Sequence, residues 1–475
     1  MCEIPAALGW VFGGLVSPIF KNAGLCVPAL NERMVNMKKN RIIAVALAGA
    51  MSLSLLAGCN DSSQAGKEEL SEVEYNVEEV VAPYLENLDP IPDADKDFVI
   101  EMGYNDCDHM VGAIIGQDTG LYKALGLNVN ITKTGKVADY MASGDMQVGY
   151  AGLAGLVNIY KKGAPVMMPA GSHTGGSKYM VVHPDVESLD EVVGGRVDIG
   201  EGKSFSLDWT EYCDQLGIPL DIATYYQGGS MSDTDGMMAL KADQIDIFTC
   251  CDPYASIAEE EGFGKIIATC WGADVKEDKS TGWGIHCGYY INSDFANAHP
   301  ELATRLVLAH CLAVQYMYLH PYSAGEMFAQ TFGTSKSVGL RTMYLKTNAE
   351  GRTLTYDITQ DNLDNYDEWW DLLGIPESEQ TKFTDAEGFM DLSWLEKTGI
   401  ESFDEFMERE NIDETQPIGM SYPDWLYWAE AVDGIDHNST DGKIEKWMNN
   451  EIVSELAPYT GDGEPYVAPK SLREQ

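Results

Sequence analysis

Residues 120–171 read GLYKALGLNVNITKTGKVADYMASGDMQVGYAGLAGLVNIYKKGAPVMMPAG. Apolar and polar residues alternate at the start of this segment, as in a half-buried strand, and later stretches have the periodicity of short helices. The predicted elements are a strand at 127–133, a helix at 137–142, a strand at 146–150, a helix at 153–161 and a strand at 165–170. Strands and helices alternating at this spacing predict a parallel, doubly wound α/β sheet.

Two glycine-rich turns follow strands of this predicted sheet. One is GYAG at 149–152, which contains Gly152, and the other is GSHTGG at 171–176, which contains His173. In doubly wound sheets, ligands bind at the carboxyl ends of strands, where such turns present backbone N–H groups. We therefore expect Gly152 and His173 to contact a ligand.

The same segment resembles the solute-binding proteins of ABC importers in the nitrate, sulfonate and taurine group, which includes binders of thiamine-pyrimidine precursors. The shared motifs are GLYK at 120–123, GLNV at 126–129, MASGDMQVG at 141–149 and KGAPVMMPAG at 162–171. Each motif is loose, but their order and spacing together are fairly specific. The resemblance implies a two-lobed periplasmic-binding-protein-like fold of type II, with doubly wound sheets and a cleft between the lobes.

The resemblance covers about residues 98–374, and it suggests a division of the whole chain. The last hundred residues extend past it and predict a helical C-terminal extension. The predicted parts are a non-native N-terminal extension at 1–36, a signal peptide at 37–58, an acidic tether at 59–97, lobe 1 at 98–182, lobe 2 at 183–284, a return to lobe 1 at 285–400 and the extension at 401–475. Crossings near 180–185 and 283–287 would form the hinge.

Composition limits the function classes. The chain has 475 residues, 45% of them hydrophobic, so it is able to bury a large core in two lobes. Its net charge of -44 leaves no basic footprint for nucleic acid. The same charge repels a free anion at long range, so an anionic solute would need positive groups inside the cleft.

The cysteines do not suggest a disulfide framework. Outside the N-terminal region seven remain, an odd number, and no C-x-x-C pair suggests zinc. We interpret most of them as free, buried, small hydrophobic residues.

The N-terminal region has the features of a bacterial lipoprotein signal. Residues 37–41 (MKKNR) are basic, residues 42–56 are apolar, and LAGC at 56–59 matches the lipobox. The resemblance implies cleavage before Cys59 and a lipid on its thiol. We therefore expect a lipid-anchored protein on the extracytoplasmic face of the cell membrane.

The loop after the first predicted strand, 98–104, contains four candidate ligand-binding residues. These are Asn105, Asp106, Asp108 and His109, because the resemblance implies that this loop contacts the ligand. Two alternatives remain open: Asp106 or Asp108 caps the next helix, or Cys107, Asp108 and His109 bind a metal ion. No second ligand cluster in the sequence supports a metal, and the spacing of the calcium-like loop at 436–444 is wrong. We therefore predict no metal and no cofactor.

The second lobe contains the remaining candidates. EGKS at 201–204 ends like a P-loop but lacks its first glycine, because Val197 occupies that position. A glycine turn before the helix at 206–216 still suits a polar ligand, and Lys203 supplies positive charge or is simply solvated. The ligand-binding candidates here are Lys203, Ser204, Ser206, Trp209, Tyr226, Asp252 and Trp283. The aromatic members either stack on a heteroaromatic ring or belong to the core, and Asp252 either contacts ligand or caps a helix.

The leading functional interpretation is a receptor that captures a small organic solute, either sulfonate- and taurine-like or thiamine-pyrimidine-like. Its partners would be the permease and ATPase subunits of an ABC importer, with the receptor itself a monomer. The alternative is an extracytoplasmic enzyme on the same fold, similar to a pyrimidine synthase, using Cys250, Cys251 or His109. No nucleophile–base motif supports the enzyme.

Overall fold

The computed structural model describes residues 70–105, 107–175, 177–199, 206–229, 231–271, 273–274, 279–280, 284–437 and 455–468. They belong to one compact unit, Glu68–Gln475. Several predictions concern residues outside this description: the N-terminal extension, the signal peptide with Cys59, Asp106, Lys203, Ser204, Trp283 and most of the loop at 436–444.

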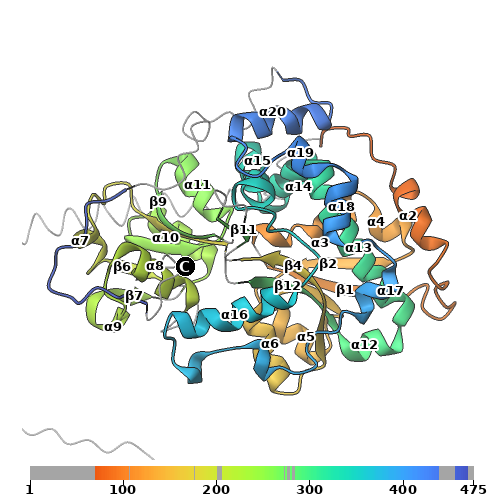
Figure 1. Cartoon of the computed structure of the whole chain (residues 1–475), viewed down its shortest axis with the longest axis horizontal. Helices are drawn as coiled ribbons and strands as arrows, with labels where there is room; N and C mark the ends of the chain where they lie inside the picture. Colours follow the sequence, from red (N-terminus) through yellow and green to blue (C-terminus); the bar gives the residue numbers. More distant parts are fainter. Residues whose placement is uncertain are drawn as a thin grey trace, which may run out of the picture. The chain divides into compact units, whose positions relative to one another are not determined.

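The first lobe is built on a five-stranded sheet with the order β2-β1-β3-β12-β4. Its strands are β1 (Val99–Tyr104), β2 (Asn128–Lys133), β3 (Val148–Gly152), β4 (Val166–Thr174) and β12 (Ile285–Asn292). β1 is parallel to β2 and β3, whereas β12 is antiparallel to β3 and β4. Figure 1 shows helices on both sides of this sheet: α3 (Gly112–Asp118), α4 (Leu121–Ala124), α5 (Val137–Ser143) and α6 (Leu153–Lys161).

The second lobe repeats this plan with the order β7-β6-β8-β5-β9. Its strands are β5 (Ser177–Val182), β6 (Arg196–Asp198), β7 (Gln227–Gly229), β8 (Ile247–Cys250) and β9 (Lys265–Trp271). β6 is parallel to β7 and β8, and β5 is antiparallel to β8 and β9. Its helices are α7 (Leu189–Val192), α8 (Leu207–Leu216), α9 (Ile222–Tyr225), α10 (Asp233–Lys241) and α11 (Tyr254–Glu261).

The predicted α/β class and its two lobes are confirmed, with mixed rather than purely parallel sheets. All five elements predicted within 120–171 are present, as β2, α5, β3, α6 and β4. The apolar pattern of residues 220–227 (LDIATYYQ) predicts a strand there, but only Gln227 lies in a strand, at the start of β7. Asp221 accepts hydrogen bonds from the backbone N–H groups of Ala223 and Thr224, and this cap begins the short helix α9.

The first crossing between the lobes comes earlier than predicted. β5 was expected to leave the first lobe, but it pairs with β8 and β9 of the second sheet. The chain therefore crosses between Thr174 and Ser177 rather than near 180–185. The second crossing precedes β12, as predicted, and Gly284 lies there with φ +79°.

A set of helices completes the first lobe. They are α12 (Ser293–Ala298), α13 (Pro300–Leu319), α14 (Pro321–Phe332), α15 (Lys336–Tyr344), the π-helical turn η2 (Leu345–Ala349) and α16 (Gln360–Leu372). Among the described residues, only α13 is long and apolar enough to cross a membrane, and 94% of its apolar window is buried inside the protein. It is the central core helix of this lobe.

The two ends of the described chain pack on the folded body. In the predicted tether, α2 (Val77–Leu85) buries Val81, and Ser71 hydrogen-bonds to Glu326, so residues 70–97 are not an extended linker. α17 (Ser393–Thr398) lies at the end of the predicted return to lobe 1, and the C-terminal extension forms α18 (Phe403–Arg409), α19 (Ile412–Thr415) and α20 (Tyr422–Val432). Ala457 then bridges to Ser188 of the second lobe.

Candidate functional site

The carboxyl ends of strands from both sheets meet in one buried polar cluster. β1 leads into the 3-10 turn η1 (Asp108–Met110), and β8 leads to Cys251 and Asp252. The backbone N–H of Asp108 donates to the carbonyl oxygen of Asp252 at 3.0 Å, which joins the two lobes at this point. This is where ligands bind in open α/β sheets.

Asp108 is the acidic centre of the cluster, and its side chain is fully buried. Its Oδ1 accepts from the backbone N–H of His109 at 2.7 Å and lies 2.6 Å from His109 Nδ1. Its Oδ2 lies 3.0 Å from Lys346 Nζ. Burial alone would raise the pKa of Asp108, but Lys346 and the hydrogen bond from His109 outweigh it and hold the pKa well below its usual range. Asp108 is therefore an ionised carboxylate.

Lys346 projects from the π-helical turn η2 and is fully buried. Its Nζ lies 2.6 Å from Glu350 Oε2, and Tyr179 of β5 donates to Glu350 Oε1 at 2.6 Å. Burial opposes the charge on Lys346, but Asp108 and Glu350 together raise its pKa. Burial raises the pKa of Glu350 to about 7, with Lys346 opposing the rise. π-helical turns are frequent at functional sites.

Asp252 anchors the second side of the cluster. It accepts from the backbone N–H and the hydroxyl of Ser256 in the first turn of α11, and the Thr342 hydroxyl donates to it at 3.3 Å. Arg341 Nη1 donates to the same Ser256 hydroxyl at 2.8 Å. Burial raises the pKa of Asp252, and Arg341 opposes the rise. Asp252 was predicted either to contact ligand or to cap this helix; it bonds to the first turn, but Pro253 occupies the N-cap position.

Three histidines from three elements gather beside Asp108. The rings of His109 and His173 stack with centroids 4.7 Å apart, and His286 lies edge-on to both, at 5.6 and 5.8 Å. Burial lowers the pKa of all three, so they are neutral at pH 7. His173 is fully buried and neither ring nitrogen has a hydrogen-bond partner in the described part of the chain. A buried polar group without a partner needs an explanation.

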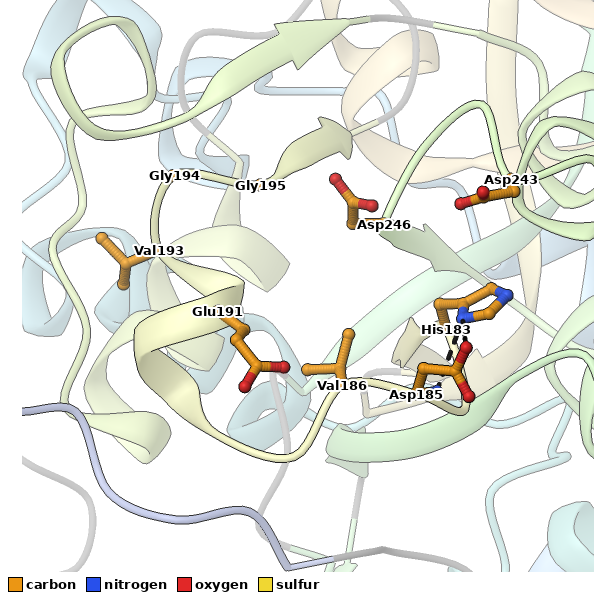
Figure 2. A pocket seen from close by; sticks show the side chains of 9 residues that line it. All are labelled: His183, Asp185, Val186, Glu191, Val193, Gly194, Gly195, Asp243 and Asp246. Carbon is orange, nitrogen blue, oxygen red and sulfur yellow. Dashed lines mark hydrogen bonds and ion pairs between the residues drawn. The ribbon is translucent and has the colours of Figure 1, made fainter.

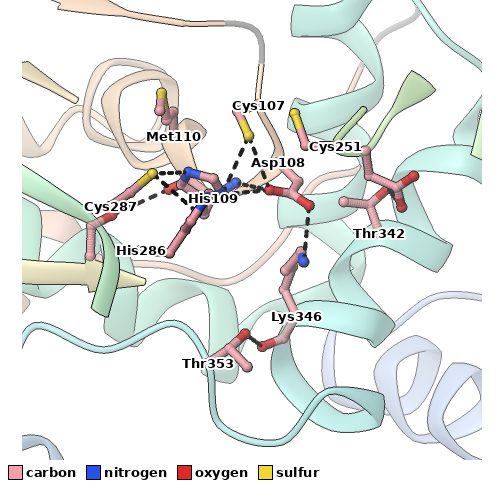
Figure 3. A network of polar contacts seen from close by, with 12 residues as sticks. Cys107, Asp108, His109, Met110, Cys251, His286, Cys287, Thr342, Lys346 and Thr353 are labelled. Carbon is pink, nitrogen blue, oxygen red and sulfur yellow. Dashed lines mark hydrogen bonds and ion pairs between the residues drawn. The ribbon is translucent and has the colours of Figure 1, made fainter. Parts of the chain in front are cut away.

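Two thiols contact His109: Cys107 Sγ lies 3.5 Å from its Nδ1 and Cys287 Sγ 2.7 Å from its Nε2, and Figure 3 shows Cys251 next to Cys107. The seven cysteines from Cys107 to Cys311 are buried and form no disulfide, as predicted for most of them. Burial raises the pKa of Cys250 and, together with a nearby Cys251, that of Cys107. These groups are therefore protonated thiols rather than reactive thiolates.

The structure brings together four of the residues predicted from sequence: Asp108, His109, His173 and Asp252. Other predicted residues lie elsewhere. Ser206 caps α8, Trp209 is fully buried with its ring N–H donating to Leu220, and Tyr226 packs edge-on against Trp209. Asn105 and Gly152 have exposed positions, Gly152 at the start of α6.

Sequence analysis missed Lys346, Glu350, Tyr179, His286 and Cys287. Lys346 and Glu350 stand four residues apart in a segment predicted to end a helix, where an i,i+4 pair is usually a solvated surface feature. The lysine follows the apolar run MYL at 343–345, and this was the available signal of burial. His286 and Cys287 lie in an apolar strand and give no such signal.

Two hollows lie outside the cluster. The larger, of about 500 Å³, is on the second lobe and is shown in Figure 2. It is lined by His183, Asp185, Val186, Glu191, Val193, Gly194, Gly195, Asp243 and Asp246, at the amino ends of β6 and β8 rather than their carboxyl ends. The other, of about 360 Å³, is lined by residues of both lobes, including Lys133, Thr234, Pro253 and Tyr254. It adjoins Asp252 along the chain.

Comparisons with known proteins agree with this architecture. The family model described as NMT1/THI5 like matches residues 108–324. No curated protein matches the chain in sequence. The ligand-binding component of an ABC-type import system from Staphylococcus aureus, solved with zinc bound, has a TM-score of 0.50 and 15% identity over 63% of this chain and 98% of its own.

Two further solved structures are similar. The aliphatic sulphonate binding protein SsuA from Escherichia coli has a TM-score of 0.46 and 14% identity, over 64% of this chain and 99% of its own. The nitrate-binding protein NrtA from Synechocystis PCC 6803 has a TM-score of 0.48 and 12% identity, over 68% and 92%. At these identities structural similarity shows the fold alone. We base the assignment of the fold on the Staphylococcus aureus component.

The fold is therefore that of the periplasmic binding proteins. Residues 108–324 are similar in sequence to the NMT1/THI5-like family. The resemblance predicted from residues 98–374 is confirmed.

Proposed function

We propose that this chain is the extracytoplasmic receptor of an ABC importer, which captures a small organic solute between its lobes and delivers it to the permease and ATPase. The buried cluster supports this proposal, because its groups come from both lobes and meet where Asp108 bonds to Asp252. A solute that binds there contacts both lobes only when they are closed. Such a solute stabilises the closed state by its differential affinity.

The charges of the cluster favour a solute that carries both signs. Asp108 and Asp252 suit an amino group, whereas Lys346 and the half-buried Lys178 of β5 supply the positive charge that the acidic chain otherwise lacks. His173 adds a buried nitrogen without a partner. A taurine-like zwitterion or an aminopyrimidine fits this set. The E. coli and Synechocystis proteins are named for binding sulphonate and nitrate, which is consistent with a solute that has an anionic end.

The lipid anchor belongs to the same proposal. The signal at 37–58 and the thiol of Cys59 would hold the receptor on the extracytoplasmic face of the membrane. The contacts expected from sequence for Asn105, Asp106, Gly152, Lys203, Ser204, Ser206, Trp209, Tyr226 and Trp283 remain predictions.

We do not extend the proposal to catalysis. An enzyme using Cys250 or Cys251 would need a thiolate, but the pKa of both thiols is raised. Burial raises the pKa of Cys250, whereas at Cys251 the hydrogen bond with Cys107 lowers the pKa and is outweighed by burial and Asp233. Binding and release of an unchanged solute needs no such group.

A thermal-shift screen of the full chain tests the proposal. The ligands are taurine, alkyl sulfonates, thiamine-pyrimidine precursors, nitrate and amino acids, and a solute that binds only the folded state raises the melting temperature. We expect a shift with one zwitterionic or sulfonate class. Calorimetry should then show that His173→Gln weakens binding by about tenfold or more, because a buried polar contact is worth ~1–3 kcal/mol.

The matched control is His183→Gln, since His183 lines the outer hollow on the second lobe and should leave affinity unchanged. A screen in which no ligand raises the melting temperature counts against the receptor. Equal affinity in the His173 variant and the wild type would remove this cluster as its binding site.

A further inference from the structure

Three side chains place possible metal-ligand atoms within 4.8 Å of one another: His109, His286 and Cys287. His109 follows β1 in the sequence, whereas His286 and Cys287 begin β12, so the fold and not the sequence brings them together. His109 Nε2 lies 2.7 Å from Cys287 Sγ, and His286 Nδ1 lies 3.4 Å from the same sulfur (Figure 3). This is the second ligand cluster that the sequence did not reveal beside Cys107, Asp108 and His109.

Asp108 fixes which nitrogen of His109 is available. An ionised carboxylate only accepts hydrogen bonds, so His109 Nδ1, 2.6 Å from Asp108 Oδ1, carries the proton. The lone pair is then on Nε2, the atom that faces Cys287. Lys346 holds the other carboxylate oxygen at 3.0 Å, which keeps Asp108 ionised and in place. A carboxylate behind a histidine is the usual arrangement around a metal-ligating imidazole.

His173 gives an independent indication that a ligand is held here. Its ring stacks on His109, it is fully buried, and within the described chain both of its nitrogens have no hydrogen-bond partner. Leaving such a buried polar group without a hydrogen bond is energetically costly. A metal-bound water or solute next to His109 would give His173 the partner that the protein itself does not supply.

The ligand types indicate the class of ion. Imidazole nitrogen and thiolate sulfur are borderline and soft ligands, which Ca²⁺ and Mg²⁺ avoid and Zn²⁺ accepts. Sites with three protein ligands keep a fourth position open for water or substrate. We propose that His109 Nε2, one ring nitrogen of His286 and Cys287 Sγ bind a divalent transition-metal ion of the Zn²⁺ class, with an open position beside His173.

Binding is balanced by the release of one proton. The Cys287 thiol gives up its proton as the sulfur–metal bond forms, and no electron is transferred. The metal site does not depend on the transport proposal, because the three ligands would hold the ion whether or not the chain serves an importer.

Cobalt titration of the full-length protein tests the site. The protein is first treated with EDTA and dialysed, and Co²⁺ is then added, because a thiolate–cobalt bond gives a charge-transfer band in the near ultraviolet. We expect the band to saturate at one Co²⁺ per chain and Zn²⁺ to displace it. Cys287→Ser should abolish the band, and Asp108→Asn should weaken binding by about 10–100-fold.

Cys270→Ser is the matched control, because Cys270 is equally buried, in β9, and takes no part in the set. It should titrate like the wild type. Circular dichroism checks that each variant folds, and His286→Gln, at a half-buried position, serves if Cys287→Ser does not. Absence of the band in the wild type, or its persistence in either ligand variant, would overturn the proposal.

The cobalt result is separable from the transport proposal. Protein that binds cobalt but shifts with no solute would support the metal site and count against the receptor. Protein that binds a sulfonate but no cobalt would support the receptor and count against the metal site.

Discussion

The ammonium group of Lys346 lies 3.0 Å from Asp108 Oδ2, and neither side chain is exposed to solvent. The two residues come from opposite ends of the first lobe's sequence, one after β1 and one in the π-helical turn η2. Desolvating two charges is expensive, and their attraction offsets that cost only while both are present. The ion pair therefore affects both the stability of the fold and the arrangement of the site.

Replacement of Lys346 by Met should destabilise the protein by about 3–5 kcal/mol, because it leaves Asp108 buried without its partner. The free energy of unfolding in urea measures this. Lys382→Met is the control: Lys382 pairs with Asp371 at the surface, where ion pairs contribute about 0–1 kcal/mol. Adding Asp108→Asn to Lys346→Met should recover part of the loss, and simple additivity of the two losses would contradict the coupling.

His310 should make the protein less stable in mild acid. Its Nε2 donates to the carbonyl of Gly171 and its Nδ1 accepts from the Tyr150 hydroxyl. Burial lowers the pKa of His310 from 6.5 to about 4, so between these values the unfolded chain takes up a proton that the folded chain does not. The contribution of His310 to the free energy of unfolding is fully present above pH 6.5, and it falls by about 3 kcal/mol as the pH falls to 4.

The variant His310→Gln isolates this contribution, because an amide is able to replace both hydrogen bonds without titrating. Its melting temperature should fall less steeply than that of the wild type between pH 6.5 and 4. Parallel pH curves for the two proteins would show that His310 does not carry the effect.

Glu350 should act in the opposite direction over a similar range. Burial raises its pKa from 4.5 to about 7, so between these values the folded chain keeps a proton that the unfolded chain has lost. Its contribution to stability is present below pH 4.5 and is lost as the pH rises through 7. Glu350→Gln should therefore gain stability relative to the wild type at pH 8 compared with pH 5.

The exposed Glu377 of η3 (Glu377–Glu379) provides the matched control, as Glu377→Gln measured at the same two pH values. If Glu350→Gln behaves in the same way, Glu350 does not keep its proton in the folded state. In the wild type the pH-dependent contributions of His310 and Glu350 to stability partly cancel. Single variants are therefore needed to show either contribution.

Gly284 should tolerate no side chain. Its φ is +79°, and a Cβ there would collide with the backbone carbonyl of Asn362 in α16. Gly284→Ala should therefore cost several kcal/mol, whereas Gly399→Ala, with φ +69° and open space around it, should cost about 1 kcal/mol. Thermal unfolding of both variants measures the difference, and equal losses would mean that backbone strain alone decides the cost at Gly284.

The fold was largely predictable from sequence because its signals are local. Alternation and capping depend on residues a few positions apart, and Thr359, for example, caps α16 with a full capping box. The strand predicted at 220–227 was wrong for the same kind of reason, since Asp221 provides a cap that outweighs the apolar pattern.

The site was only partly predictable because its contacts are between distant residues. The loop after β1 and the turn after β8 were identified as strand ends, which placed Asp108, His109 and Asp252 correctly near one another. Trp209 was expected at a ligand, but its ring N–H is bonded to Leu220 within the second lobe's core, so Trp209→Ala is now expected to destabilise the fold. Nothing in the sequence places Lys346 or Cys287 beside Asp108.

The π-helical turn that carries Lys346 makes the buried cluster sensitive to a change in chain length. A π turn contains one residue more than the α-helical turn it replaces. Removal of a single residue between Leu345 and Ala349 would restore an α-helical turn and rotate Glu350 away from Tyr179, while the helix α15 before it stayed intact. A one-residue deletion here would thus remove the contact between Glu350 and Tyr179 from the buried cluster, and it would leave both sheets unchanged.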